Sequence, residues 1–272
     1  MNTRLASGDS ADLGRHALAL GDLETSDLEV VFIHLDASAG ASVELWDLLS
    51  NDEQRRAERF RYAEHRHKYI LARAGLRRLL AERLHVAPRA IELVENSYDK
   101  PRLAPKHGST DLKFNLSHSA NLAVYAFTRG PEVGVDVEQV RQIPDAAELA
   151  EGFFSPDETV SLKSLPIDQR SLAFLACWTR KEAVIKAMGL GLSCPLDAFD
   201  VTIDPHGPAR VTRIDARFGK AAHWQLRAFT PCQSYIAAVA CHTGNHSFDM
   251  EPQVLIAPAT ASVNDMASIS WP

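Results

Sequence analysis

Apolar and polar residues alternate over Val133–Glu138, where three valines are separated by Gly134, Asp136 and Glu138. This pattern is typical of a β-strand with one buried face, because successive side chains of a strand point to opposite sides of its sheet. We therefore predict that the valines face the core and that the two acids project together from the other face. A surface strand carrying two solvated acids would have the same pattern.

A helix is predicted from Ser171 to Met188, and Gly189 is well placed to end it. Trp178, Glu182 and Lys186 are spaced four residues apart, so they lie roughly along one face of this helix. One interpretation is a surface Glu–Lys pair that stabilises the helix by about 0.3–0.5 kcal/mol. The other is a third carboxylate and a lysine directed at the same site as the acids of the strand.

The remaining pattern predicts two halves of the α+β class, each with a helix packed on an antiparallel sheet. Further strands are expected at 29–35, 91–95, 123–127, 198–203, 225–229 and 235–240, and helices at 52–84 (one or two), 146–154 and 157–165. We divide the chain into an N-terminal subdomain (1–127), a C-terminal subdomain (128–244) and a tail (245–272). The tail is rich in Ala, Ser, Pro and Thr, which predicts a flexible appendage.

Composition is that of a globular protein, because 46% of the 272 residues are hydrophobic. No run of about 18 apolar residues is present, so no membrane span is expected. The first residues contain no stretch of signal-peptide type, and a cytoplasmic location is expected. The net charge of −6 argues against non-specific nucleic-acid binding. The four cysteines form no C-x-x-C pair and are expected to be reduced thiols.

Basic residues are nevertheless concentrated between residues 51 and 89. Most of them are expected to lie on solvated helix faces beside the glutamates of the same region. A few would be enough to bind a phosphate-bearing ligand, because guanidinium and ammonium groups neutralise phosphate well.

Five short motifs follow one another in the chain: Tyr98–Pro101 (YDKP), Phe114–Ser119 (FNLSHS), Val133–Glu138 (VGVDVE), Phe153–Ser155 (FFS) and Trp178–Leu192 (WTRKEAVIKAMGLGL). In this combination and order they resemble the 4′-phosphopantetheinyl transferases. The length resembles the larger, Sfp-type monomeric group, which activates peptide synthetases, polyketide synthases and fatty-acid synthases. The resemblance implies two similar subdomains related by pseudo-twofold symmetry, with the active site at their junction.

The resemblance also implies an activity. It is the Mg²⁺-dependent transfer of the 4′-phosphopantetheine arm of coenzyme A to a serine of an apo-acyl or apo-peptidyl carrier protein. Adenosine 3′,5′-bisphosphate is the other product, and Mn²⁺ is a possible substitute for Mg²⁺. No nucleic-acid or membrane partner is implied, and a monomer suffices because both halves of the site lie in one chain.

By resemblance, Asp136, Glu138 and Glu182 are the metal ligands. Glu182 is also the expected catalytic base, directly or through a water molecule. Lys186 is the expected catalytic cation that stabilises the diphosphate and the departing bisphosphate. The remaining coenzyme A contacts implied by the family motifs or by spacing are Arg56, Lys68, Lys100, Ser117 and His118, with His118 on the 3′-phosphate; Arg73 and Arg77 are additional candidates, and Asp136 and Lys186 belong to both sets.

Two local features qualify this assignment. Asp99 stands where the family usually has glycine before the lysine, and we expect the turn to survive because Asp tolerates turn geometry. Phe153 and Phe154 match part of the family's carrier-docking surface, although at least one of them is expected to be a core residue.

Two other function classes stay open. The first is another Mg²⁺-dependent phosphotransferase that acts on a different diphosphate substrate. The second is a catalytically inactive carrier-binding homologue, against which the presence of all three carboxylates and Lys186 argues.

Overall fold

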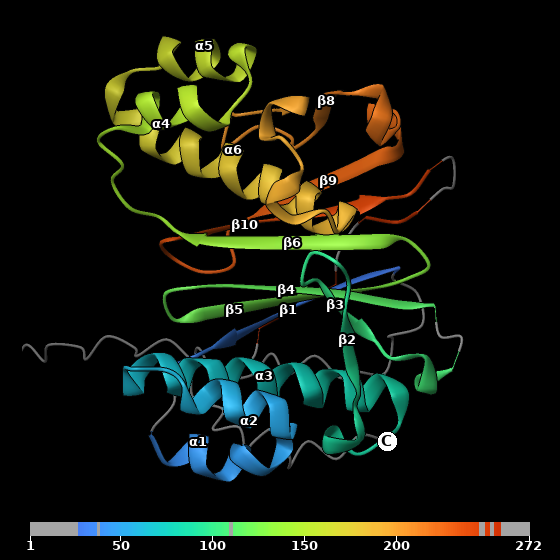
Figure 1. Cartoon of the computed structure of the whole chain (residues 1–272). Coiled ribbons are helices and arrows are strands. Elements are labelled where there is room, and N and C mark those ends of the chain that lie inside the picture. The colour runs from blue at the N-terminus through green and yellow to red at the C-terminus, as the bar shows by residue number, and fades with distance from the viewer. Residues whose placement is uncertain (1–26, 37–38, 109–110, 245–247, 251–252, 257–272) are drawn as a thin grey trace, which may run out of the picture.

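The computed structural model of the chain describes residues 27–36, 39–108, 111–244, 248–250 and 253–256. Within this range the elements form four layers (Figure 1): helices, a four-stranded sheet, a three-stranded sheet and helices again. None of the described helices is both long enough and apolar enough to cross a membrane.

The first two layers are built mostly from the N-terminal half. The large helix α3 packs on the four-stranded sheet, whose strand order is β11-β1-β5-β4. The strands β1, β5 and β4 pair antiparallel to one another. The elements of this half are β1 (Leu28–His34), α1 (Ala39–Leu45), α2 (Asn51–Glu58), α3 (Ala63–Leu84), β2 (Leu93–Glu95), β3 (Pro101–Leu103), β4 (Leu112–Ser119) and β5 (Leu122–Arg129).

The other two layers belong to the C-terminal half. The helix α6 packs on the three-stranded antiparallel sheet β6-β10-β9, and α4 and α5 lie beside it (Figure 1). The elements of this half are β6 (Glu132–Gln139), α4 (Ala146–Phe153), α5 (Pro156–Ser164), α6 (Ile167–Met188), β7 (Phe199–Val201), β8 (Val211–Ile214), β9 (Trp224–Phe229) and β10 (Tyr235–His242).

The two sheets meet face to face through an apolar interior. Val133, Val135 and Val137 of β6 pack against residues of β1 and β5 in one buried cluster. The valines of β6 therefore face the core as predicted, and the residues between them face the opposite way, toward α6. Burial of this double-sheet interface places the edge strands β4 and β6 side by side at the junction of the two halves (Figure 1).

The predicted α+β class is confirmed, and several boundaries differ from expectation. The basic region 52–84 forms two helices, because the helical conformation is interrupted between Glu58 and Ala63. The predicted subdomain boundary after residue 127 cuts β5, which continues to Arg129. The prediction that the whole tail is an appendage is wrong for Gln253–Ile256, which forms β11 and pairs parallel with β1. Most of the rest of the tail lies outside the described residues.

Gly134 determines how closely α6 approaches β6. A Cβ atom at this position would collide with the backbone carbonyl oxygen of Ala183 and the backbone nitrogen of Ala187 in α6. Only a residue without a side chain fits between the strand and the helix, because the atoms that a Cβ would meet belong to the helix backbone and cannot move without moving the helix.

We therefore expect Gly134→Ala to destabilise the protein by about 1–3 kcal/mol or more, because it forces α6 away from the sheet. Gly152→Ala is the matched control: a Cβ there meets no atom within 4 Å, so it should be neutral or slightly stabilising in α4. Chemical denaturation of the two variants measures the difference. Equal stabilities would contradict the close-packing explanation.

Candidate active site

Polar side chains of β4 join the two halves along the junction. The side chain of Asn115 accepts a hydrogen bond from the Val135 backbone nitrogen at 2.9 Å. Ser117 Oγ donates to Asp136 Oδ1 at 2.7 Å, and Ser119 Oγ donates to Glu138 Oε2 at 3.0 Å. We call Asn115, Ser117 and Ser119 the polar seam. The seam orients both acids of β6, a role that the sequence pattern did not reveal for Asn115 and Ser119.

Asp136 is the centre of the site. The residue is only 4% exposed, and Lys186 Nζ lies 2.6 Å from its Oδ1 atom. The same ammonium group is 2.9 Å from Ser117 Oγ. The second carboxylate oxygen, Oδ2, is buried, and no donor among the described residues lies within hydrogen-bond distance of it. An unpartnered buried carboxylate oxygen is costly unless a cation or donor reaches it.

Glu182 and Glu138 lie within electrostatic range of Asp136. Burial raises the pKa of Glu182, and the charges of Asp136 and Glu138 raise it further, while Lys186 opposes them. Glu138 also receives an ion-pair contact from Arg141, at 3.3 Å. The structure thus brings Asp136, Glu138, Glu182 and Lys186 together, and we call these four predicted residues the acid–lysine site.

The donor chemistry fits a hard divalent cation, which prefers carboxylate oxygens. Asp136, with its unpartnered Oδ2, would hold such an ion together with Glu138 and Glu182. In the described residues, no group of three or more Asp, Glu, His or Cys side chains already has a metal-binding arrangement. Lys186 supplies the positive charge at Asp136 instead.

Ser117 and His118 point to opposite sides of β4, as neighbouring strand residues must. His118 lies on the side of α3, where its pKa is lowered by partial burial and then by the positive charges of Lys186, Arg73 and Lys68. A bound anion would relieve this repulsion. The two residues of the predicted pair therefore lie in separate regions, Ser117 at the acids and His118 at the basic residues.

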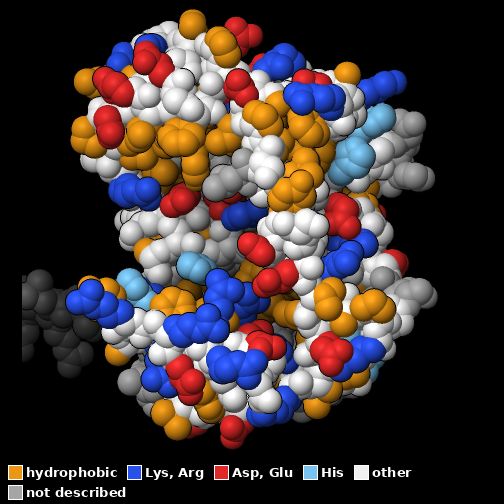
Figure 2. All heavy atoms as spheres, viewed as in Figure 1, with side chains coloured by type: hydrophobic (Ala, Val, Ile, Leu, Met, Phe, Trp, Pro, Cys, Tyr) orange, Lys and Arg blue, Asp and Glu red, His pale blue; other side chains and the backbone are white. Residues whose placement is uncertain are grey.

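The predicted basic ligands on α2 and α3 have different surroundings. Arg56 and Arg73 each lie 5.8 Å from the ring centroid of Tyr69 and line a cavity of about 360 Å³. Lys68 is ion-paired with Glu64 at 2.6 Å. Figure 2 shows Lys, Arg and His side chains gathered on the lower half of the molecule near its waist.

Arg77 also borders this cavity, but its guanidinium is already committed. The residue is 2% exposed. It donates to Glu53 at 2.6 Å and to the carbonyl oxygens of Pro88 and Ile91 at 2.9 and 3.0 Å. The candidate role of Arg77 in phosphate binding is therefore corrected to a structural one.

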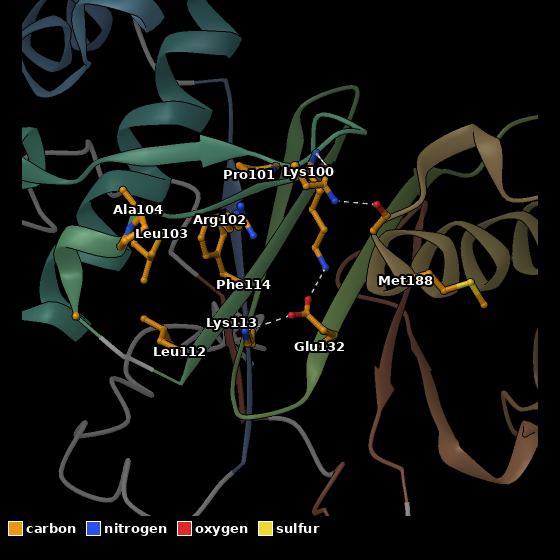
Figure 3. A pocket seen from close by; sticks show the side chains of 14 residues that line it. Lys100, Pro101, Arg102, Leu103, Ala104, Leu112, Lys113, Phe114, Glu132 and Met188 are labelled. Carbon is orange, nitrogen blue, oxygen red and sulfur yellow. Dashed lines mark hydrogen bonds and ion pairs between the residues drawn. The ribbon is translucent and has the colours of Figure 1, made fainter. Parts of the chain in front are cut away.

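The ammonium group of Lys100 contacts other residues of the chain at the junction of the two halves. Its Nζ atom lies 3.0 Å from Glu132, 3.2 Å from the Val133 carbonyl oxygen and 3.3 Å from that of Ala187. Figure 3 shows Lys100 reaching Glu132, which Lys113 contacts from the other side. These residues line a cavity of about 570 Å³. A ligand contact by Lys100 stays a prediction, since its ammonium already has these partners.

The expected turn before Lys100 is confirmed. Asp99 has a positive φ of 61°, the left-handed conformation that glycine adopts more readily. The side chain of Asn96 supports the turn by accepting hydrogen bonds from the backbone nitrogens of Tyr98 and Lys100, at 2.9 and 3.0 Å.

Phe153 and Phe154 have different environments. Phe154 is 5% exposed and stacks on Phe174 in the core, whereas Phe153 is 45% exposed and meets Trp178 edge-on. The expectation that one of the two is a core residue is confirmed. Figure 2 shows hydrophobic side chains gathered on the surface around α4 and α6.

The raised pKa of Glu182 predicts a stability effect. A carboxylate whose pKa is higher in the folded protein destabilises the fold as the pH rises above its ordinary value of 4.5. With chelator present, Glu182→Gln should therefore melt a few degrees higher than the wild type at pH 7. This difference in melting temperature between the variant and the wild type should become smaller as the pH falls toward 4.5.

Thermal denaturation at several pH values measures this effect. Glu148→Gln, at an exposed position of α4, is the control and should change the melting temperature little. A Glu182→Gln variant that is less stable than the wild type at pH 7 would show that the charge of Glu182 is stabilised by its surroundings.

Two family models match the two halves of the chain. Residues 132–240 match the model of the 4′-phosphopantetheinyl transferase superfamily, and residues 38–129 match that of the 4′-phosphopantetheinyl transferase N-terminal domain. The chain is 36% identical to the 4′-phosphopantetheinyl transferase HetI of Nostoc sp. over 208 residues, which cover 76% of this chain and 84% of the relative.

Two relatives from Bacillus subtilis are also similar. One 4′-phosphopantetheinyl transferase is 30% identical over 185 residues, which are 68% of this chain and 80% of the relative. The transferase Sfp of strain 168 is 29% identical over 168 residues, which are 62% of this chain and 72% of Sfp. The chain therefore belongs to the 4′-phosphopantetheinyl transferase superfamily.

Proposed function

We propose that this protein transfers the 4′-phosphopantetheine arm of coenzyme A to a serine of an apo-carrier protein. The convergence of Asp136, Glu138, Glu182 and Lys186 from one strand and one helix is the observation that carries this proposal. Family membership supplies the substrate class, since the relatives named above are phosphopantetheinyl transferases.

In this reaction the serine oxygen forms a bond to the phosphorus that carries pantetheine. The bond from that phosphorus to the bridging oxygen of the diphosphate breaks, and adenosine 3′,5′-bisphosphate leaves with the electron pair. Glu182 would accept the proton of the serine, directly or through a water molecule. Lys186 stabilises negative charge on the diphosphate oxygens. A divalent ion bound by the three acids would supply further charge neutralisation.

The basic side of the junction supports binding of the nucleotide. Lys68, Arg73 and Lys186 already impose a positive field on His118. A phosphate near His118 would oppose the burial and the positive charges that lower its pKa, because a negative charge stabilises the imidazolium form. Arg56, beside the ring of Tyr69, is placed to extend this binding surface.

The exposed Phe153 supports docking of the carrier protein. Its ring is packed on Trp178, which precedes Glu182 by one helical turn, so an apolar contact there would lie on the same helix as the catalytic residues. Aromatic side chains with apolar surroundings are favoured at protein interfaces.

The direct test is mass spectrometry of apo-carriers of peptide, polyketide and fatty-acid type, incubated with coenzyme A and Mg²⁺. We expect a mass gain of one phosphopantetheine on serine and its loss with chelator. Asp136→Asn should reduce transfer about a hundredfold or more, because it removes the central carboxylate charge. Asp111→Asn, which changes only an exposed ion pair with Arg129, is the matched control and should act like the wild type.

The same assay distinguishes the proposed activity from both alternatives, because neither of them changes the mass of a carrier. A phosphotransferase acting on another diphosphate would leave all carriers at their apo mass. An inactive homologue would bind a carrier without changing its mass at any Mg²⁺ concentration. Either result would overturn the proposed activity.

The docking role of Phe153 has its own test. Phe153→Ala should raise the KM for the carrier several-fold and leave the KM for coenzyme A unchanged, with little loss of stability. Phe154→Ala should instead lower stability by about 3–5 kcal/mol, as expected for a buried ring. If transfer by Phe153→Ala falls only in step with its melting temperature, Phe153 is not a docking residue.

A further inference from the structure

The carboxylate of Asp136 is already neutralised by a cation of the protein. Lys186 Nζ, Asp136 Oδ1 and Ser117 Oγ form a closed triangle with sides of 2.6, 2.7 and 2.9 Å. The Asp136 side chain is 6% exposed, so solvent contributes little to balancing its charge. Lys186 is thus the principal counter-ion of this acid.

A divalent ion at the free Oδ2 of Asp136 would repel the ammonium group at Oδ1, and this repulsion is strong because the Asp136 side chain is largely excluded from solvent. The backbone of α6 lies directly against β6 at Gly134, so it leaves no room for the helix to adjust toward the strand. The side chain of Lys186 can move, since it is 27% exposed and carries its charge on a flexible four-carbon stem. An exchange of cations at Asp136 would therefore need only a rotation of this side chain.

The other nearby cation is less important. Arg141 contacts Glu138 at 3.3 Å, but its side chain is 58% exposed. Solvent screens this pair, and exposed ion pairs contribute little. Lys186 is therefore the cation whose removal should change the affinity of the acids for a metal ion.

We propose that Lys186 is the resident cation of the acidic site and makes metal binding depend on the diphosphate. In the ligand-free protein its ammonium competes with a divalent ion for Asp136. A diphosphate ends this competition by attracting the ammonium to its own oxygens. The inference rests on the metal ligands of the proposed function, and it predicts that metal and coenzyme A each strengthen binding of the other.

The test is a titration of the ligand-free protein with Mn²⁺, followed by electron paramagnetic resonance of the free ion. We expect Lys186→Met to bind Mn²⁺ about tenfold more tightly than the wild type, because the competing charge is gone. Lys186→Gln, which keeps a polar group beside Ser117, should behave in the same way. Lys186→Arg keeps the charge and should bind Mn²⁺ as weakly as the wild type.

Lys163→Met is the matched control, because it removes a lysine that is ion-paired with Glu151 away from the acids. Its Mn²⁺ affinity should equal that of the wild type. Circular dichroism and melting of each variant identify any loss of folding. If folded Lys186→Met or Lys186→Gln binds Mn²⁺ no more tightly than the wild type, the exchange model is overturned.

Coenzyme A provides the second measurement. It should increase the Mn²⁺ affinity of the wild type by a larger factor than that of Lys186→Met; equal factors would overturn the proposed coupling. Failure of transfer to every carrier, with the Mn²⁺ results as expected, would overturn the proposed function and leave the exchange standing. Transfer with unchanged Mn²⁺ affinities would overturn the exchange alone.

Discussion

The close contact between the backbone of α6 and Gly134 of β6 is the constraint on which the site depends. It brings Glu182 and Lys186 of the helix to Asp136 and Glu138 of the strand. The helix is also held on its other side, where buried Lys181 contacts Glu158 at 2.8 Å and the carbonyl oxygens of Leu196 and Phe199 at 2.7 and 2.5 Å. Separating the two charges of such a buried ion pair costs stability, so α6 is held in place on both sides.

Negative charge is in excess on one side of the junction, around Glu182, and positive charge is in excess on the other, around His118. Burial, followed by neighbouring acids, raises the pKa of Glu182, whereas burial, followed by neighbouring cations, lowers the pKa of His118. A ligand that brings a cation to the acids and a phosphate to the basic residues would relieve both. Opposite pKa shifts of this kind are common where a protein is arranged for a charged substrate.

The polar seam explains why one short motif serves both sides. Along β4, Asn115, Ser117 and Ser119 face β6, while Leu116 packs in the N-terminal core and His118 faces the basic residues. Edge strands present unpaired backbone groups. The seam satisfies two of these on β6, the backbone nitrogens of Val135 and Gln139, and orients the acids at the same time.

Patterns among neighbouring residues were enough to predict the local faces of the chain: the valine face of β6, the helix that carries Glu182 and Lys186, and the α+β pattern of both halves. The ordered motifs also identified the family and the four residues of the acid–lysine site. These features follow from periodicity and from short motifs, each of which is encoded by neighbouring residues.

The packing of the elements in space is what establishes which charged groups come into contact. The pairing of Lys186 with Asp136, the structural role of Arg77, the partners of Lys100 and the addition of β11 beside β1 all join residues far apart in the chain. The burial of Phe154 but not of Phe153 depends in the same way on what packs against the end of α4. Local patterns fix the direction of a side chain relative to its own element, and its partner depends on how the elements pack.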